Sequence, residues 1–291
     1  MSDVSAIEWT NATLNILVGC EKISSGCTNC YACKEVVRMA GNPNPKVAAA
    51  TLGLAYRQKN GILNWTGVVR QLPERLAKPF DWPRPKLVFV NSLSDMFLPG
   101  VSLDFIRRSF AVMAATPWHT YQVLTRRAER LAELSPFIDW PDNVWMGVSI
   151  ESQAYVSRAD HLRRTGAAVK FLSVEPLLGP VELDLAGIDW VITGGESGRR
   201  ARPFDPAWAL SVRDQCERSN VAFFHKQNGG RNKKATGRLL AGGTYDAMPP
   251  VRERSVPPAK ERRALARRLV PEAFEGTGPE GLARPGASPR V

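Results

Sequence analysis

The chain has 291 residues, 44% of them hydrophobic, and carries 39 Lys/Arg against 28 Asp/Glu for a formal net charge of +11. This length and composition suffice for one large domain or two small ones. A run of eighteen apolar residues, which would indicate a membrane span, is absent, and the opening Met-Ser-Asp-Val-Ser lacks the pattern of a secretory signal. We therefore expect a cytoplasmic protein without membrane association.

Short apolar runs rich in β-branched and aromatic residues recur along the chain, which is typical of buried strands. Between them, apolar residues recur at three- and four-residue steps, as in 103–113 and 155–162, and Asp205-Pro206 begins a further helix. This alternation predicts parallel β/α units and a parallel (β/α) barrel, partial or full, although the spacing alone leaves a doubly wound open sheet possible. The predicted strands are 15–18, 67–70, 87–91, 121–125, 144–150, 169–174, 190–193 and 221–225.

Polar residues follow the later strands. In a parallel barrel the carboxyl ends of all strands meet at one rim, where active sites form. We therefore predict a polar pocket at that rim. The segments that would build it are 91–95, 125–127, 149–151, 173–176, 194–197 and 226–227.

Four of the five cysteines lie within fourteen positions directly after the first predicted strand. Thiolates are soft ligands, and a short loop lets Cys20, Cys27 and Cys30 converge on one metal centre at little entropic cost. Three thiolates leave a four-iron cluster with one open iron. The alternative is a closed zinc site that also uses Cys33. We favour packing for Cys33, and we expect Cys216 to be a core residue.

The last residues differ from the rest in composition. From Pro250 onward the chain holds nine Lys/Arg and five Glu among many Pro and Gly residues. We predict a domain over 1–248 and a mobile, separable basic tail over 249–291, which either assists binding of a polyanion or is only a solvated end. The basic charge indicates either contact with nucleic acid or a surface that only sets solubility, and no base-reading motif accompanies it.

Several motifs carry a resemblance to known proteins. The pattern begins with Glu8-Trp9-Thr10, continues as Gly19-Cys20 and Gly26-Cys27, and ends the loop with Asn29-Cys30-Tyr31-Ala32. It resembles the radical S-adenosylmethionine (SAM) superfamily, and more closely a phage and bacterial family named for its three-cysteine motif, whose substrate is unassigned. The resemblance spans residues 7 to 230 and includes the later segments 88–97, 147–149, 171–179 and 194–198.

The resemblance implies a 4Fe-4S cluster in the loop 19–33, held by Cys20, Cys27 and Cys30. Its open iron would chelate SAM, and an electron from an external donor would release a 5′-deoxyadenosyl radical that abstracts hydrogen from a substrate. A nucleic acid or nucleotide is our first expectation for that substrate, and a peptide or small metabolite the second. We expect SAM to contact Tyr31, Asn91, Ser94, Asp95, Thr125, Ser149 and Glu196, and we take Glu151, Glu175 and Lys226 as catalytic candidates.

The loop departs from the superfamily at two points. Six residues rather than three separate Cys20 from Cys27, and Asn29 replaces the aromatic residue that usually precedes the last ligand. Tyr31, which follows Cys30, is our candidate for the role of that aromatic residue. Two rival functions remain open at this point: a nucleic-acid-binding protein with a structural zinc or cluster and no radical chemistry, and a cluster-based redox sensor.

Overall fold

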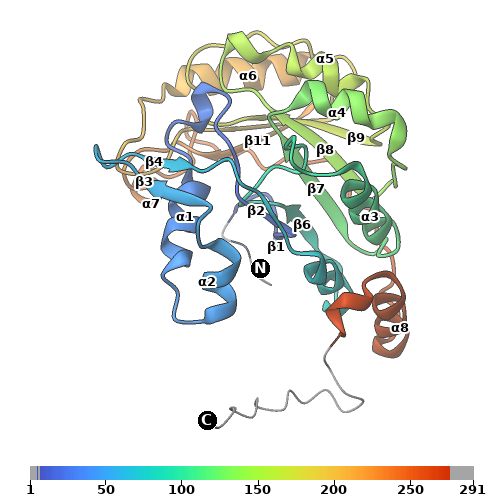
Figure 1. Cartoon of the computed structure of the whole chain (residues 1–291). Helices are drawn as coiled ribbons and strands as arrows, with labels where there is room; N and C mark the ends of the chain where they lie inside the picture. The colour runs from blue at the N-terminus through green and yellow to red at the C-terminus, as the bar shows by residue number, and fades with distance from the viewer. Residues whose placement is uncertain (1–4, 6, 276–291) are drawn as a thin grey trace.

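Seven strands form one parallel sheet in which spatial order follows chain order. The structure is a computed structural model that describes residues 5 and 7–275 (Figure 1). Because every crossover between neighbouring parallel strands has the same hand, the connecting helices lie on one face and the sheet curls into a partial (β/α) barrel with β1 and β11 at its edges. The strands are β1 (Ala12–Leu14), β6 (Leu87–Val90), β7 (Thr120–Thr125), β8 (Val144–Ser149), β9 (Val169–Val174), β10 (Trp190–Gly194) and β11 (Ala222–Gln227).

Helices cover the outer face of the sheet, and aromatic side chains fill its inner face. Figure 1 shows α3 (Leu103–Ala114), α4 (Ala128–Leu134), α5 (Arg158–Arg163) and α6 (Pro206–Arg218) following the curl of the sheet. Asp205 caps α6 as expected, because its carboxylate accepts a hydrogen bond from the Ala207 N–H. The inner cluster consists of Trp9, Phe89, Trp145, Phe171, Trp190, Ile192 and Phe224.

One glycine makes this inner packing possible. A Cβ atom on Gly147 would lie 2.4 Å from the ring of Phe171 on the neighbouring strand. Only a residue without a side chain therefore fits at this position of β8, which explains the glycine in the segment 147–149.

The prediction of eight barrel strands is wrong at two of them. The segments 15–18 and 67–70 contribute instead to a separate antiparallel pair, β2 (Leu17–Val18) with β5 (Arg70–Gln71). The Asn91 carboxamide oxygen accepts hydrogen bonds from the N–H groups of Ile16 and Leu17, which draws the chain out of the sheet after β1. The other six predicted strands lie in the sheet, and their sequential order rules out the doubly wound alternative.

A long insertion between β2 and β6 carries the cysteines. It contains the short 3-10 helix η1 (Ser25–Cys27), the helices α1 (Tyr31–Ala40) and α2 (Pro45–Thr51), and the hairpin β3 (Ala55–Arg57) with β4 (Leu63–Trp65). An apolar cluster that includes Val36, Leu54 and Trp65 holds these elements together and packs them beside the barrel. The remaining short elements are η2 (Pro73–Asp81), η3 (Ser135–Phe137), η4 (Gln153–Tyr155), α7 (Lys233–Thr236) and η5 (Pro271–Ala273).

The segment after residue 249 is packed on the barrel as far as it is described, contrary to the expected mobile tail. Helix α8 (Ala259–Leu269) lies against η2, and both Ala266 of the helix and Val270 directly after it are buried. The buried Arg262 guanidinium donates to the carbonyls of Phe80 and Trp82, so a residue counted as surface charge in the sequence is an anchor. Residues 276–291 lie outside the described residues. Within 7–275, no helix combines the length and apolar character needed to cross a membrane.

We expect Arg262→Ala to lower the free energy of unfolding by about 1–3 kcal/mol, because it leaves buried carbonyl groups without their donor. Urea denaturation of the full chain measures this change. The matched control is Arg263→Ala, which removes an exposed arginine of the same helix and should change stability by less than about 0.5 kcal/mol. Equal stabilities of the two variants would contradict the anchoring role of Arg262.

Candidate functional site

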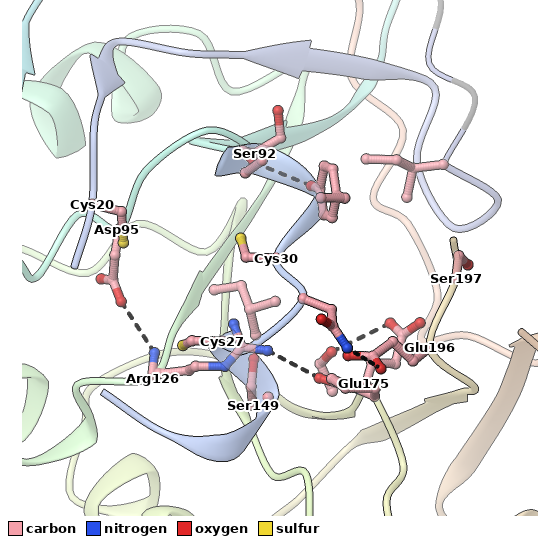
Figure 2. Close-up of a pocket in the computed structure, with 18 of the residues that line it drawn as sticks. Cys20, Cys27, Cys30, Ser92, Asp95, Arg126, Ser149, Glu175, Glu196 and Ser197 are labelled. Atoms are coloured by element: carbon pink, nitrogen blue, oxygen red, sulfur yellow. Dashed lines mark hydrogen bonds between the residues drawn. The ribbon is translucent and has the colours of Figure 1, made fainter. Parts of the chain in front are cut away.

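A cavity of about 440 Å³ opens at the carboxyl ends of the parallel strands and is lined by Cys20, Cys27 and Cys30 (Figure 2). The sequence had placed a polar pocket at this rim, and the structure brings most of the candidate residues to it. The residues proposed from the sequence that line the cavity are Tyr31, Asn91, Ser94, Asp95, Thr125, Ser149, Glu175, Glu196 and Lys226. Glu151 is not among the lining residues.

The three cysteines are free thiols that face one open space in Figure 2. Burial, followed by the charge of Asp95, raises the pKa of the Cys20 thiol to about 12. Burial also raises the pKa of Cys30. Within the described part of the chain, no set of three His, Cys, Asp or Glu side chains is positioned to hold a metal ion.

Cys33 lies apart from the other three. Its side chain is 1% exposed and packs in the apolar cluster with Val18, Val36 and Trp65, and it does not line the cavity. Cys216 is likewise buried in the main core, where α6 faces the sheet.

A buried ion pair holds the loop next to Cys20. The Asp95 carboxylate accepts hydrogen bonds from Thr125 Oγ1 at 2.7 Å and from Arg127 Nη1 at 3.1 Å. The other guanidinium nitrogen of Arg127 donates to the carbonyl of Glu21, at 3.2 Å. Asp95 thus reaches the residue after Cys20 through Arg127.

A second buried pair holds the loop next to Cys27. One Glu151 oxygen accepts a hydrogen bond from the Gly26 N–H at 3.1 Å, and the other accepts from Arg158 Nη1 at 2.9 Å. Glu151 is 0% exposed. The sequence suggested that this residue contacts substrate or moves protons, whereas the structure places it beneath the loop as a support for Gly26.

A third pair holds the loop next to Cys30. One oxygen of Glu196 accepts from the Asn29 side-chain amide at 3.0 Å and from Arg202 Nε at 2.9 Å. Arg202 also donates to the carbonyl of Ser25, at 3.0 Å. Although burial opposes ionisation, the hydrogen bonds from Arg202 and Asn29 keep the pKa of Glu196 below its ordinary value.

The same carboxylate–arginine arrangement therefore recurs beside each of the three cysteines. Hydrogen bonds between charged groups are the strong ones in proteins, and a buried pair that loses one partner leaves an uncompensated charge. Sequence reasoning missed this arrangement. Arg127 and Arg158 carry no signal in the sequence that distinguishes them from surface cations.

The cavity walls hold several polar atoms that have no hydrogen-bond partner. Ten buried side-chain nitrogen or oxygen atoms in the described residues lack a partner, and five of them belong to residues that line this cavity. Buried polar groups are normally satisfied, so their concentration here indicates that the cavity accommodates a polar ligand. The five atoms are Trp9 Nε1, Asn91 Nδ2, Arg126 Nε, Ser149 Oγ and Gln227 Oε1.

Two further contacts in the cavity wall involve Glu175. Lys226 Nζ lies 3.1 Å from a carboxylate oxygen of Glu175, and Arg126 Nη2 donates to the Glu175 carbonyl at 3.0 Å. Although burial disfavours the charge of Arg126, electrostatic interaction with the neighbouring Cys27 and Glu151 raises its pKa. A cation thus stands next to the cysteines. At the mouth, the exposed Tyr31 ring is fixed by a hydrogen bond from its hydroxyl to the Ser92 carbonyl.

Gly26→Ala should loosen the loop at Cys27. A Cβ atom on residue 26 would lie 3.0 Å from the carboxyl carbon of Glu151, so the side chain that supports the loop must move. We expect iodoacetamide to alkylate Cys27 roughly tenfold faster in this variant, as quantified by peptide mass spectrometry. Gly41→Ala is the control, because its nearest neighbour would be 3.8 Å away. Alkylation of Cys27 at the same rate in both variants would contradict the support by Glu151.

Comparison with known proteins gives one family match. The matching family model is described as "Protein of unknown function (DUF5131)" and covers residues 4–249, which include the whole sheet and the cysteine loop. Neither the curated proteins nor the solved structures contain a match to the chain. Because the matched region is well over half of its length, the chain belongs to the DUF5131 family of proteins of unknown function.

Proposed function

We propose that this protein is a cytoplasmic radical SAM enzyme that carries a 4Fe-4S cluster on Cys20, Cys27 and Cys30. The observation that supports the proposal is that three free thiols and five buried polar atoms without a hydrogen-bond partner share one cavity at the carboxyl ends of a parallel partial barrel. Active sites of parallel β/α barrels form at this end. The substrate is unidentified, and an anionic one such as a nucleic acid or nucleotide suits the basic chain.

The number of thiols suits such a cofactor pair, because a four-iron cluster binds one thiolate on each of three irons and does not need three side chains around a single ion. Three thiols are the ligand number that leaves one iron of a four-iron cluster free, and Cys33 is packed elsewhere. When bound, the reduced cluster would supply the electron that cleaves SAM and yields the 5′-deoxyadenosyl radical. The protein contributes position, charge and exclusion of water.

Different residues of the cavity serve different purposes in this proposal. Asp95 and Glu196 accept hydrogen bonds on both carboxylate oxygens, so we assign them to positioning the loop rather than to direct binding of the SAM amino group. Ser149 Oγ and Asn91 Nδ2 are the partnerless groups that we assign to SAM. Arg126 provides a positive charge beside Cys27 for a carboxylate.

Glu175 and Lys226 remain as candidates for handling a proton or an anionic substrate group. They form an ion pair at 3.1 Å, and both side chains line the cavity. Because the pair is only partly buried, substrate can reach it. Glu151, in contrast, is enclosed beneath the loop and has no role as an acid or base in this mechanism.

We expect Cys20→Ala, Cys27→Ala and Cys30→Ala each to abolish iron incorporation, whereas Cys33→Ala retains about four irons per chain. The measurement is iron content and visible absorbance after anaerobic reconstitution, followed by detection of 5′-deoxyadenosine with SAM and a reductant. Loss of the cluster in Cys33→Ala would contradict a cluster that is held by three cysteines and has one iron free for SAM. A colourless protein with one stoichiometric zinc would support the nucleic-acid-binding alternative, and a cluster that never cleaves SAM would support the redox sensor.

Ser149→Ala should weaken SAM binding without loss of iron. Removing one neutral hydrogen bond costs about 0.5–1.5 kcal/mol, which corresponds to a roughly two- to tenfold higher dissociation constant. Anaerobic equilibrium dialysis with labelled SAM measures this change. Ser109→Ala is the control, because Ser109 is equally buried but donates to the Phe105 carbonyl within α3. An unchanged affinity in Ser149→Ala would remove Ser149 from the binding site.

A further inference from the structure

The positive charge of the chain is concentrated in three segments. Residues 36–73, 197–204 and 218–245 together contain fourteen Lys/Arg and no Asp/Glu. The rest of the chain holds the other 25 of the 39 Lys/Arg together with all 28 Asp/Glu, so it has a slight negative excess. The whole net charge of +11 therefore originates in these segments.

Loops from the three segments lie together beside the cavity. The loop after β10 and the loop after β11 run side by side, joined by a bridge between Ser197 and Gly230. The Arg200 guanidinium lies against Gly61 in the turn of the β3–β4 hairpin, because a Cβ atom on Gly61 would be 3.8 Å from it. Figure 1 shows α7 and the hairpin on the same side of the molecule.

Contacts with the cysteine loop connect this basic rim to the cavity. Asn29, which precedes Cys30, donates to the carbonyl of Arg200 at 2.8 Å. Glu196 and Ser197, at the start of the loop after β10, themselves line the cavity, as does Lys233 in the loop after β11. A ligand held on the rim is therefore adjacent to the cavity that the thiols line.

Four cations of the rim are exposed and have no ion-pair partner in the described structure: Arg199, Arg200, Arg231 and Lys234. Their neighbours differ, since Arg202, Lys233 and Arg238 are paired with Glu196, Glu8 and Asp246. Unpaired cations held together without compensating carboxylates attract polyanions and release counterions when they bind one.

The cavity behind the rim offers a complementary surface for a base. The rings of Trp9, Trp65, Phe89 and Tyr31 line it together with the partnerless polar atoms. Enzymes that modify a base hold the phosphate backbone outside and receive the extruded nucleotide in a pocket of aromatic and hydrogen-bonding groups. An acidic protein would use the cationic rim but would leave such a pocket without a purpose.

We infer that the loops after β10 and β11, together with the β3–β4 turn, bind the phosphate backbone of a single nucleic-acid strand and present one nucleotide to the cavity. This inference rests on the proposed function and deepens it, because it names the substrate class and the surface that receives it. The strand contacts Arg199, Arg200, Arg231 and Lys234 through its phosphates.

The test compares two full-length variants with the same change in charge. The first is R199Q/R200Q/R231Q/K234Q at the rim, and the second is K260Q/R263Q/R267Q/R268Q, which neutralises four exposed cations of α8, far from the rim in Figure 1. Fluorescence anisotropy with labelled single-stranded RNA and DNA 12-mers measures affinity as a function of salt, without SAM or reductant. Unfolding by urea verifies that both variants are folded.

We expect the rim variant to bind at least about tenfold more weakly and to show a slope of log K against log salt that is smaller by about 3, close to 0.7 for each lost phosphate contact. The α8 variant should retain the affinity and slope of the unmodified chain. Equal losses in both variants would overturn the inference, because they would show an effect of net charge alone. Failure of the unmodified chain to bind either oligonucleotide, or rim-dependent binding of polyglutamate or anionic vesicles in their place, would overturn it as well.

Failure of this inference and failure of the proposed function are distinguishable. Release of 5′-deoxyadenosine from SAM does not require the rim, so the rim variant should retain uncoupled SAM cleavage. Cleavage of SAM without rim-dependent strand binding would support the proposed enzyme class and exclude the inferred nucleic-acid substrate. Rim-dependent strand binding without any cleavage of SAM would support the nucleic-acid-binding surface and exclude the proposed radical chemistry.

Discussion

The site depends on buried carboxylates that hold the cysteine loop from below. Apart from the 3-10 turn Ser25–Cys27, the residues between Cys20 and Cys30 form no regular structure that could fix the thiols. Their position comes from the barrel instead, through Asp95, Glu151 and Glu196 and the arginine that each one binds. These carboxylates follow β6, β8 and β10, so alternate strands of the sheet support successive parts of the loop.

This support constrains what else the carboxylates can do. A carboxylate whose two oxygens both accept hydrogen bonds from a guanidinium and from hydroxyl, backbone or amide donors has no free oxygen to exchange a proton with a ligand. Asp95 and Glu196 are such groups, even though they line the cavity. The intervening strands instead carry Glu175, which follows β9, and Lys226, which lies on β11, and both side chains line the cavity. The curl of the sheet thus separates residues that position the loop from residues that face a ligand.

Sequence patterns predicted the regular part of this fold and the location of the cavity, because both follow from periodicity. Six of the eight predicted strands lie in the sheet, and nearly all the polar residues at their ends reach one cavity. The failures have a common cause, which is that a local pattern does not show long-range contacts. The Asn91 amide redirects the segment 15–18, and the anchoring of Arg262 on η2 depends on residues about 180 positions earlier. Glu151 ends a strand as a catalytic carboxylate would, and only its contacts with Gly26 and Arg158 show that it supports the loop.

The location of the positive charge was the property that the sequence predicted least well, because a net charge does not show where the charged residues lie in the fold. The obvious basic cluster lies on α8, which packs on η2 and contributes no residue to the cavity. The informative feature is the absence of acidic residues from segments far apart in the chain, two of which the fold joins beside the cavity. A site that holds an anionic metal–thiolate centre would itself repel a polyanion. In the proposed enzyme, the unpaired cations on the rim and Arg126 beside the thiols would offset that repulsion and would allow both to occupy one end of the barrel.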